Sequence, residues 1–423
     1  MKFSVITISF FLLVLLLAHS LLVVTQCPSP VPDAFAQVRP GNVVAAYFGG
    51  WDAYTNYQVN NVQDVASDLT HLLYAFVVPS LETGRCELMD PKVDVGLNLE
   101  QKNKLGGNFA QLRMLKNKNP HLKLLLSFGG GTHSKIFFEI ARQGKLKECV
   151  TSLVDMLDYC QSVYLNPETN LFEEQTFRYA GLFDGLDIDI EWSSSTIDQK
   201  DVDVYHLFIK MLSRQLRKKE QVQKQAQKKT KKYLLTSAVQ VHPKIIAAMQ
   251  LPKIAPLVNW FHVMTYDYGG PKGPSVSMNA PICNAHSSLS IDGSLNTFMN
   301  EGISPTKLVL GIPLYGQVYD KTKPKIGASF SKTEKTRPLL YKHIKKQYLD
   351  NDQCHTKWHE VSKAPYAYCP DDGVFVSYDN HESIKYKVDY AKFKKLKGIF
   401  FWRLSGDDQD HSLIKSLRKS NHP

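Results

Sequence analysis

Eight short apolar runs recur along this chain of 423 residues, and they constrain its fold more than any other feature. Each run is too short for a buried helix and is rich in residues that favour strands. Stretches with a helical pattern lie between them, so the sequence predicts an α/β fold of the (β/α)8 TIM-barrel type. The runs occupy residues 42–48, 71–78, 122–128, 185–191, 233–239, 260–266, 307–314 and 398–404.

The connection between the last two runs is far longer than the others. Residues 318–397 contain strand-like pieces of their own, such as YAYCP and VFVSYD. A loop of this length without regular structure is uncommon inside a compact domain. We therefore expect a small α+β insertion between barrel strands seven and eight, within one barrel domain over residues 27–423.

The first 26 residues have the features of a secretory signal peptide. A lysine at position 2 precedes a long apolar run, and Ala18-His19-Ser20 resembles a small-x-small cleavage site. The apolar residues LLVV follow at once, so an uncleaved membrane anchor is the alternative. We expect a secreted, extracellular protein with no stable membrane association after signal cleavage.

The seven cysteines fit an oxidising compartment, and their spacing does not resemble a zinc site. Cys354 and Cys369 lie close together in a loop-rich stretch and are the best candidates for a disulfide. Cys149 and Cys160 are expected to share one helix, in which a separation of about 16 Å would keep them from pairing. The odd count leaves one thiol free or paired outside the chain.

Much of the formal net charge of +11 lies in the segment from Arg214 to Tyr233. Such a run can bind polyanions, including nucleic acid. It contains almost no aromatic residues to stack on bases, so a solvated surface helix and loop is the favoured interpretation. We expect a monomer without a nucleic-acid partner.

The stretch FDGLDIDIEW, residues 183–192, places acids at alternate positions of a strand-like run. Side chains two apart share one face of a strand, so Asp187, Asp189 and Glu191 should lie together inside a barrel. Like charges this close raise at least one pKa, and a carboxylic acid that keeps its proton near neutral pH can serve as a general acid. Glu191 would lie at the C-terminal end of its strand, where barrel active sites are found. Asp184 is expected to be structural.

Three other interpretations of these acids are less well supported. An exposed acidic edge strand would suffer from repulsion between neighbouring carboxylates. A calcium loop needs turn residues and a glycine between its ligands, where this stretch has isoleucines. The DID triplet resembles the metal-binding DxD of some glycosyltransferases, but no nucleotide-binding motif accompanies it. We therefore expect no metal ion and no organic cofactor.

The acidic stretch DGLDIDIE resembles the DGxDxDxE signature of glycoside hydrolase family 18, the chitinase family. Further family-like motifs follow in order: YFGGWDAY at 47–54, SFGG at 127–130, MTYD at 264–267, LVLGIPLYG at 308–316 and FFWRLSGDD at 400–408. The resemblance covers about residues 42–415. It implies a glycosidase that hydrolyses chitin or chito-oligosaccharides, endo-acting rather than exo-acting.

The resemblance also implies a retaining, substrate-assisted mechanism, in contrast to the two-carboxylate mechanism of most glycosidases. Glu191 would protonate the glycosidic oxygen while the N-acetyl oxygen of the sugar attacks the anomeric carbon. Asp189 would hydrogen-bond the acetamido N–H, and Asp187 would support Asp189 from deeper in the barrel. Tyr266 would donate its hydroxyl to the acetamido oxygen.

A set of sugar-binding residues follows from the same resemblance. Trp402 would stack beneath the reacting ring, Asp267 would contact the bound sugar, and Trp51 would form a platform on the non-reducing side. Core packing is the alternative role for the aromatic residues, and close backbone approach is the alternative for the glycines. The other expected contacts are Tyr47, Gly129, Gly130, Met264 and Tyr315.

Three departures from the family pattern bear on the substrate. Gly131 follows SFGG where many chitinases have an aromatic residue, DYGGPKGPSV lacks a tryptophan, and Gln317 stands in place of an arginine. Fewer flat rings on the leaving-group side predict weak binding of long or crystalline chitin. The expected substrates are therefore short or soluble.

Two alternative functions remain open. One is a catalytically inactive sugar-binding relative, although such relatives typically lack the final acid that is present here as Glu191. The other is an endo-β-N-acetylglucosaminidase that acts on N-glycans, whose signature is nearly the same. The long insertion favours a chitinase over this second alternative.

Overall fold

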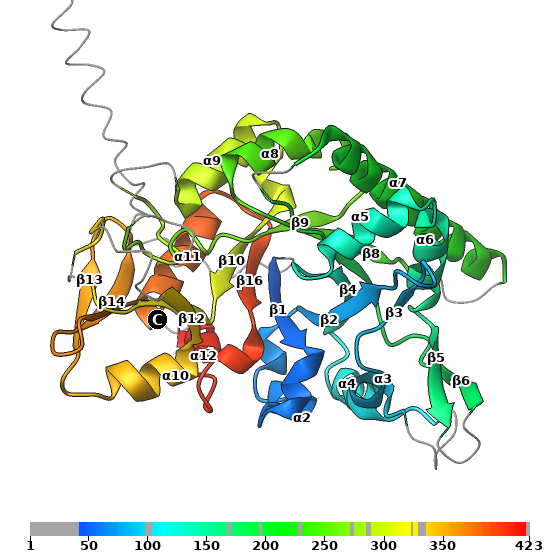
Figure 1. The fold of residues 1–423 in the computed structure, drawn as a ribbon, viewed down its shortest axis with the longest axis horizontal. Helices are drawn as coiled ribbons and strands as arrows, with labels where there is room; N and C mark the ends of the chain where they lie inside the picture. Colours follow the sequence, from blue (N-terminus) through cyan, green and yellow to red (C-terminus); the bar gives the residue numbers. More distant parts are fainter. Residues whose placement is uncertain are drawn as a thin grey trace, which may run out of the picture.

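The eight predicted strands form a closed parallel barrel in the computed structural model (Figure 1). Their order is β1-β16-β10-β9-β8-β7-β4-β2, and pairing between β1 and β2 closes the ring. The structure describes residues 42–97, 104–166, 171–193, 197–226, 231–270, 275–284, 289–322, 325–328 and 336–419, so the expected signal peptide lies outside the described residues. The barrel strands are β1 (Val43–Gly49), β2 (His71–Pro79), β4 (Lys123–Gly129), β7 (Gly185–Asp189), β8 (Leu234–Val239), β9 (Trp260–Val263), β10 (Leu308–Pro313) and β16 (Gly398–Trp402).

Helices follow the barrel strands along the chain and surround them (Figure 1). Within the described residues, no helix combines the length and the apolar character needed to cross a membrane. The helices are α2 (Val59–Val62), α3 (Pro91–Val95), α4 (Gly107–Lys118), α5 (Ser134–Arg142), α6 (Leu146–Asp155), α7 (Gln199–Gln225), α8 (Pro243–Met249), α9 (Ile291–Asn300), α10 (Tyr341–Ile344), α11 (His381–Phe393) and α12 (Ser412–Lys419).

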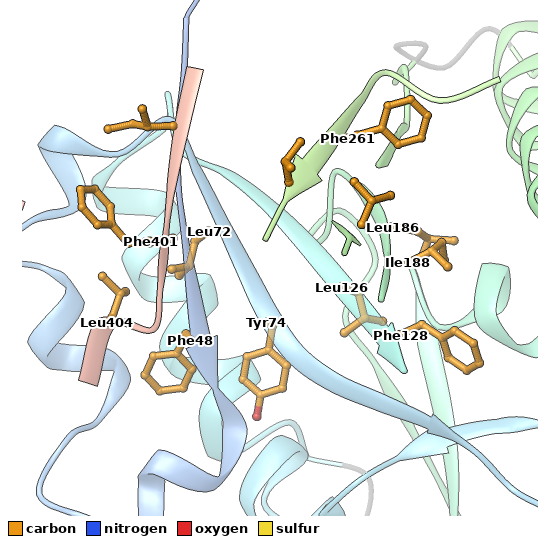
Figure 2. Close-up of a cluster of buried hydrophobic side chains, with 14 of the residues drawn as sticks. Phe48, Leu72, Tyr74, Leu126, Phe128, Leu186, Ile188, Phe261, Phe401 and Leu404 are labelled. Atoms are coloured by element: carbon orange, nitrogen blue, oxygen red, sulfur yellow. The ribbon is translucent and has the colours of Figure 1, made fainter. Parts of the chain in front are cut away.

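Side chains along each barrel strand point alternately outward and inward, so the core has one part between strands and helices and another inside the barrel. Leu126 and Phe128 on β4, and Leu186 and Ile188 on β7, belong to the large core cluster between strands and helices (Figure 2). The residues between them face the barrel interior, where a second apolar cluster includes Leu125 of β4. Asp187 and Asp189 take the inward positions of β7, as the two-residue period predicts.

The long connection after β10 forms a five-stranded antiparallel sheet of order β12-β11-β15-β14-β13. The sheet begins three residues before the predicted boundary, and α11 behind it contacts the barrel strands β10 and β16. The expected Cys354–Cys369 disulfide joins the residue before β13 to the last residue of β14. Its strands are β11 (Tyr315–Tyr319), β12 (Thr336–Leu340), β13 (His355–His359), β14 (Ala364–Cys369) and β15 (Val374–Ser377).

A hairpin of β5 (Tyr159–Asn166) and β6 (Leu171–Arg178) was not predicted. The expectation that Cys149 and Cys160 share one helix is therefore wrong. Cys149 lies in α6, which ends at Asp155, and Cys160 lies in β5.

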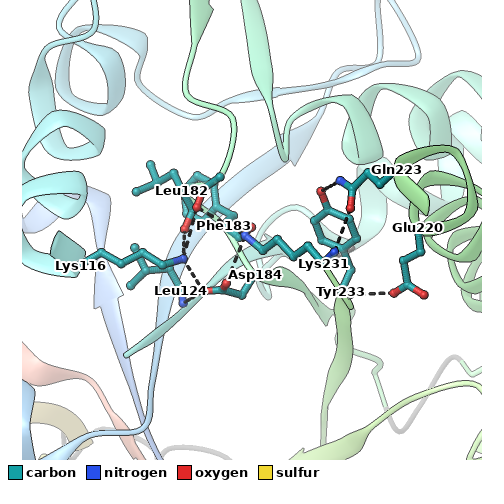
Figure 3. A network of polar contacts seen from close by, with 10 residues as sticks. Lys116, Leu124, Leu182, Phe183, Asp184, Glu220, Gln223, Lys231 and Tyr233 are labelled. Carbon is teal, nitrogen blue, oxygen red and sulfur yellow. Dashed lines mark hydrogen bonds and ion pairs between the residues drawn. The ribbon is translucent and has the colours of Figure 1, made fainter. Parts of the chain in front are cut away.

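Asp184, just before β7, is structural as predicted (Figure 3). Its Oδ2 accepts hydrogen bonds from Lys116 Nζ at 2.5 Å and from the backbone N–H of Leu124 at 2.8 Å. Lys231 Nζ lies 3.1 Å from its Oδ1. Burial raises the pKa of Asp184, but the two lysines outweigh this effect and lower the pKa overall. Lys231, which belongs to the basic segment Arg214–Tyr233, thus has a structural role.

Candidate active site

Asp187 is fully buried inside the barrel and accepts hydrogen bonds from side chains on four other barrel strands. The hydroxyls of Tyr47 and Ser127 lie 2.7 and 2.9 Å from its Oδ2. Thr236 Oγ1 lies 2.6 Å and His262 Nδ1 lies 3.0 Å from its Oδ1. Ser127 and Thr236 are the register partners of Asp187 on β4 and β8, so the strand pairing itself brings these donors to the carboxylate.

These donors decide the charge of Asp187. Burial by itself raises the pKa of the carboxyl group, because it penalises the charged form. The hydrogen bonds from His262, Thr236 and Tyr47 outweigh burial and lower the pKa below its usual value. Asp187 is therefore a carboxylate whose two oxygens are both occupied by protein donors.

His262 is a positioning residue that the motif comparison missed. Trp260 Nε1 lies 3.0 Å from His262 Nε2, and an indole N–H can only donate, so Nε2 must accept. The ring proton consequently lies on Nδ1 and points to Asp187. His262 is two residues before Met264 on the same inward face, and this two-residue spacing is the signal that could have found it.

Replacing His262 by Phe should therefore weaken both folding and activity. The change removes one donor from Asp187 and leaves the buried indole N–H of Trp260 without an acceptor, at about 1–3 kcal/mol for each unsatisfied group. His262→Asn restores one amide donor and should lose less stability. Urea unfolding and kcat of the two variants give the measurement, and equal stability of wild type and His262→Phe would contradict the assigned role.

Asp189, unlike the ionised Asp187, favours its protonated form. It is 4% exposed, and its pKa is raised well above the usual value, first by burial and then by the charges of Glu191 and Asp187. Its Oδ1 is buried and has no hydrogen-bond partner among the described residues. The predicted raised pKa in the acidic stretch is thus found on Asp189. Its free oxygen can accept a hydrogen bond from a bound molecule.

Glu191 lies just beyond the end of β7, and Gly131 leaves room for its side chain. The backbone N–H of Glu191 donates to Ser134 Oγ at 2.8 Å, and this hydroxyl donates to the carbonyl of Gly130 at 3.0 Å. A Cβ atom at position 131 would lie 2.8 Å from Glu191 Oε1, closer than such contacts normally come. The glycine that departs from the family pattern therefore sits directly against the carboxylate.

A cavity of about 140 Å³ is lined by Asp189 and Glu191 and shares much of its lining with a cleft of about 1500 Å³. Eight of the predicted site residues meet around it, whereas Asp187 lies beneath them. Phe76, Gly131 and Ala238 complete the lining and were not predicted as contacts. The eight predicted residues are Tyr47, Asp189, Glu191, Met264, Tyr266, Asp267, Tyr315 and Trp402.

Asp267 is held at the cavity edge by two side chains of β11. Tyr315 donates its hydroxyl to Asp267 Oδ1 at 2.6 Å, and Gln317 Nε2 donates to the same oxygen at 3.1 Å. The backbone of Asp267 is left-handed with a φ of 60°, and its N–H donates to Asn279 Oδ1 at 3.2 Å. Gln317, noted in the sequence only as a departure, thus orients a predicted sugar contact.

Trp51 does not line either the cavity or the wider cleft, although it was predicted to be a sugar platform. Its ring stacks on Phe76 with centroids 5.7 Å apart. The guanidinium of Arg403 lies 5.3 Å from the same ring, as a cation–π contact. Arg403 also forms an ion pair with Asp52, so several groups fix the position of Trp51.

Gly129 and Gly130 also lie outside the cavity lining. Their φ angles are 113° and 84°, in the region that favours glycine. A Cβ atom at Gly129 would lie 2.4 Å from the backbone oxygen of Asp189, and one at Gly130 would lie 2.8 Å from the ring of Phe76. These contacts favour the alternative role, in which the glycines allow close approach of the backbone.

The described residues contain no group of three or more His, Cys, Asp or Glu side chains arranged to hold a metal ion. What the site offers instead is a pair of unequal acids beside an aromatic-lined cavity. One buried acid favours its protonated form, and another carboxylic acid stands at the rim. This arrangement suits proton transfer to a bound molecule.

Comparison with known proteins agrees with this geometry. The profile of "Glycosyl hydrolases family 18" matches residues 43–407. Chitinase A1 of Niallia circulans is 28% identical over 92% of this chain, and the class V chitinase CHIT5 of Lotus japonicus is 26% identical over 91%. The chain spans about three fifths (60%) of the length of the bacterial relative and 88% of the plant relative.

The solved structure of chitinase ChiA74 from Bacillus thuringiensis has the same fold, with a TM-score of 0.73 and 27% identity. The match covers 90% of this chain and 70% of that one. The family match extends over most of the chain and includes every barrel strand from β1 to β16. The chain therefore belongs to glycosyl hydrolase family 18.

Proposed function

We propose that this protein is a chitinase that hydrolyses β-1,4-linked N-acetylglucosamine chains with retention of configuration. One observation carries the proposal: Glu191, Asp189 and Tyr266 all line one small cavity, and the buried Oδ1 of Asp189 has no hydrogen-bond partner among the described residues. These groups match what an N-acetyl sugar requires, namely a proton donor for the leaving oxygen and polar partners for the acetamido group. Burial raises the pKa of the Tyr266 phenol well above its usual value, so its hydroxyl remains a donor.

The same geometry explains why the substrate would supply its own nucleophile. Both oxygens of Asp187 are occupied by protein donors, and Asp187 lies below the cavity. Asp189 sits beneath Glu191 and holds its own proton preferentially. No carboxylate among these three is thus placed to attack the anomeric carbon while Glu191 acts as the acid.

The reaction would then proceed in two steps. Glu191 gives its proton to the glycosidic oxygen, the bond from this oxygen to the anomeric carbon breaks, and the acetamido oxygen bonds to that carbon to form an oxazolinium ion. Asp189 accepts the acetamido N–H and, by carrying a proton, relieves repulsion as Glu191 becomes charged. Water then attacks the anomeric carbon, the bond from that carbon to the acetamido oxygen breaks, and the water gives a proton to Glu191, which restores the acetamido group, the acid and the original configuration.

The cleft walls support a preference for short or soluble chains. The part of the cleft towards α5 and α7 is lined by Phe138, by aliphatic side chains and by the exposed ion pair of Arg142 with Asp201. Stacking on flat rings is how such clefts hold long sugar chains, and neither Gly131 nor Gln317 supplies one. We propose that the enzyme is endo-acting on oligomers, is secreted as a monomer and has low activity on crystalline chitin.

The test uses residues 27–423 and N-acetylglucosamine oligomers of three to six sugars, with insoluble chitin beside them. Products are followed by mass and by the anomeric form of the first fragment released. Cleavage of the oligomers with the β-anomer as the first product supports the proposal. The α-anomer as the first product would contradict substrate assistance. Binding of the oligomers without cleavage would make the protein a sugar-binding relative instead.

A further inference from the structure

The turn between β2 and β3 brings Leu81 to the rim of the cleft. Leu81 is 46% exposed and lines the cleft wall. β3 (Cys86–Leu88) is a short strand that pairs with β2 through three residues, the first of which is Cys86 opposite Pro79. Lys145 Nζ reaches across from before α6 and donates to the carbonyls of Leu81 and Glu82 at 3.3 and 3.0 Å. Lys145 thus adds two contacts to the hydrogen bonds within the turn, such as the one from the backbone N–H of Ser80 to the carbonyl of Arg85 at 2.8 Å.

Two buried thiols meet where this turn joins α6. Cys86 Sγ lies 2.7 Å from Cys149 Sγ, although non-bonded heavy atoms reach optimal contact only at about 3.5–4.0 Å. The two residues are 5% and 0% exposed. The backbone N–H of Cys86 donates to Ser152 Oγ at 2.8 Å, so the strand and the helix are already fixed in the orientation that brings the sulfurs together.

We propose that Cys86 and Cys149 form a disulfide, which ties β3 to α6 and fixes the cleft-rim turn at residues 80–85. The oxidant is a small disulfide such as glutathione disulfide. One cysteine thiolate attacks it, releases one glutathione thiolate and forms a mixed disulfide, which the other cysteine then attacks to release the second glutathione. The two cysteine thiols lose two hydrogens in total, and glutathione disulfide becomes two thiols.

Cys160 is the internal control for this proposal. It is a third buried free thiol, 4% exposed, and it lies on β5. A count of thiols in the denatured but unreduced protein therefore distinguishes a specific bridge from general oxidation. The expected redox state is a bridged Cys86–Cys149 pair beside a reduced Cys160.

The first experiment folds the protein in a glutathione redox buffer, denatures it without reductant and alkylates it. Peptide mass mapping should find Cys160 alkylated and a linked peptide pair that contains Cys86 and Cys149 and lacks two hydrogens. Quantitative alkylation of both Cys86 and Cys149 would overturn the proposal. This count requires no variant, so a folding defect cannot obscure it.

The second experiment measures the effect on the turn. Arg85 is exposed and directly precedes Cys86, so the rate of tryptic cleavage at Arg85 reports how firmly the turn is held. The double variant Cys86→Ser/Cys149→Ser should be cut at Arg85 several-fold faster than wild type, with Cys160→Ser as the matched control at the wild-type rate. Equal rates in wild type and double variant would show that no cross-link holds the turn.

Discussion

Glu191→Gln should abolish hydrolysis of N-acetylglucosamine oligomers while leaving their binding nearly unchanged. Glutamine keeps the shape of the side chain but cannot give up a proton, and a positioned general acid contributes about 10²–10⁴-fold to the rate. Glu191 lines both the cavity and the wider cleft, whereas the buried Asp189 lines the cavity alone and the buried Asp187 lines neither. We therefore expect kcat to fall by at least about 10³-fold, because the residue is required in both steps.

Initial rates and oligomer binding by calorimetry give the measurement. Glu148→Gln, on the exposed face of α6, is a matched control that makes the same chemical change far from the cavity and should retain full activity. A Glu191→Gln protein with more than a tenth of the wild-type kcat would contradict the role of this residue as the acid. Loss of binding together with activity would instead assign Glu191 to substrate recognition.

The barrel and its acidic strand could be predicted because both depend on local patterns. The two-residue period placed Asp187 and Asp189 on the inner face, and the strand end placed Glu191 at the cavity, as the structure confirms. The direction of the pKa shift could also be predicted from the spacing, because carboxylates two residues apart on a strand repel each other, although burial is the larger cause at Asp189.

Other features depend on residues that are distant in the sequence and could not be predicted in this way. Tyr47 and His262 reach Asp187 from 140 and 75 residues away, and only the register of the closed barrel brings them together. Trp51 lies in a recognisable motif, yet Phe76 and Arg403 hold its ring outside the cavity lining. A motif predicts where a side chain lies along the fold, whereas its orientation depends on packing against other elements.

Asparagine at positions 187 and 189 should change stability in opposite directions at pH 7. The pKa of Asp189 is raised above its ordinary 3.8, so the folded state binds this proton more tightly than the unfolded state does. Stability is therefore lost as pH rises from that ordinary value through the folded pKa. At neutral pH the unfolded chain has Asp189 ionised, so folding must either bind a proton or bury a charge. Asp189→Asn removes this cost and should gain about 1–3 kcal/mol, while its activity is lost.

The stability that Asp187 contributes depends on pH in the opposite direction, because the pKa of Asp187 is lowered in the folded state. Its contribution to stability is present at neutral pH and is lost as pH falls through the folded pKa. Asp187→Asn puts an amide donor against the donors of Thr236 or Ser127 and should cost about 1.5–3 kcal/mol, the usual value of a hydrogen bond to a charged group.

Urea unfolding of wild type and both variants at pH 7 and at pH 3 tests this pair of predictions. The gain of Asp189→Asn should shrink at pH 3, where wild-type Asp189 is protonated in both the folded and the unfolded state, and the loss of Asp187→Asn should shrink as well. A stability change of the same sign for both variants at pH 7 would show that the two aspartates do not differ in charge. Opposite signs would mean that the active site retains Asp189 at the expense of stability, which is expected of a group placed there for catalysis rather than for folding.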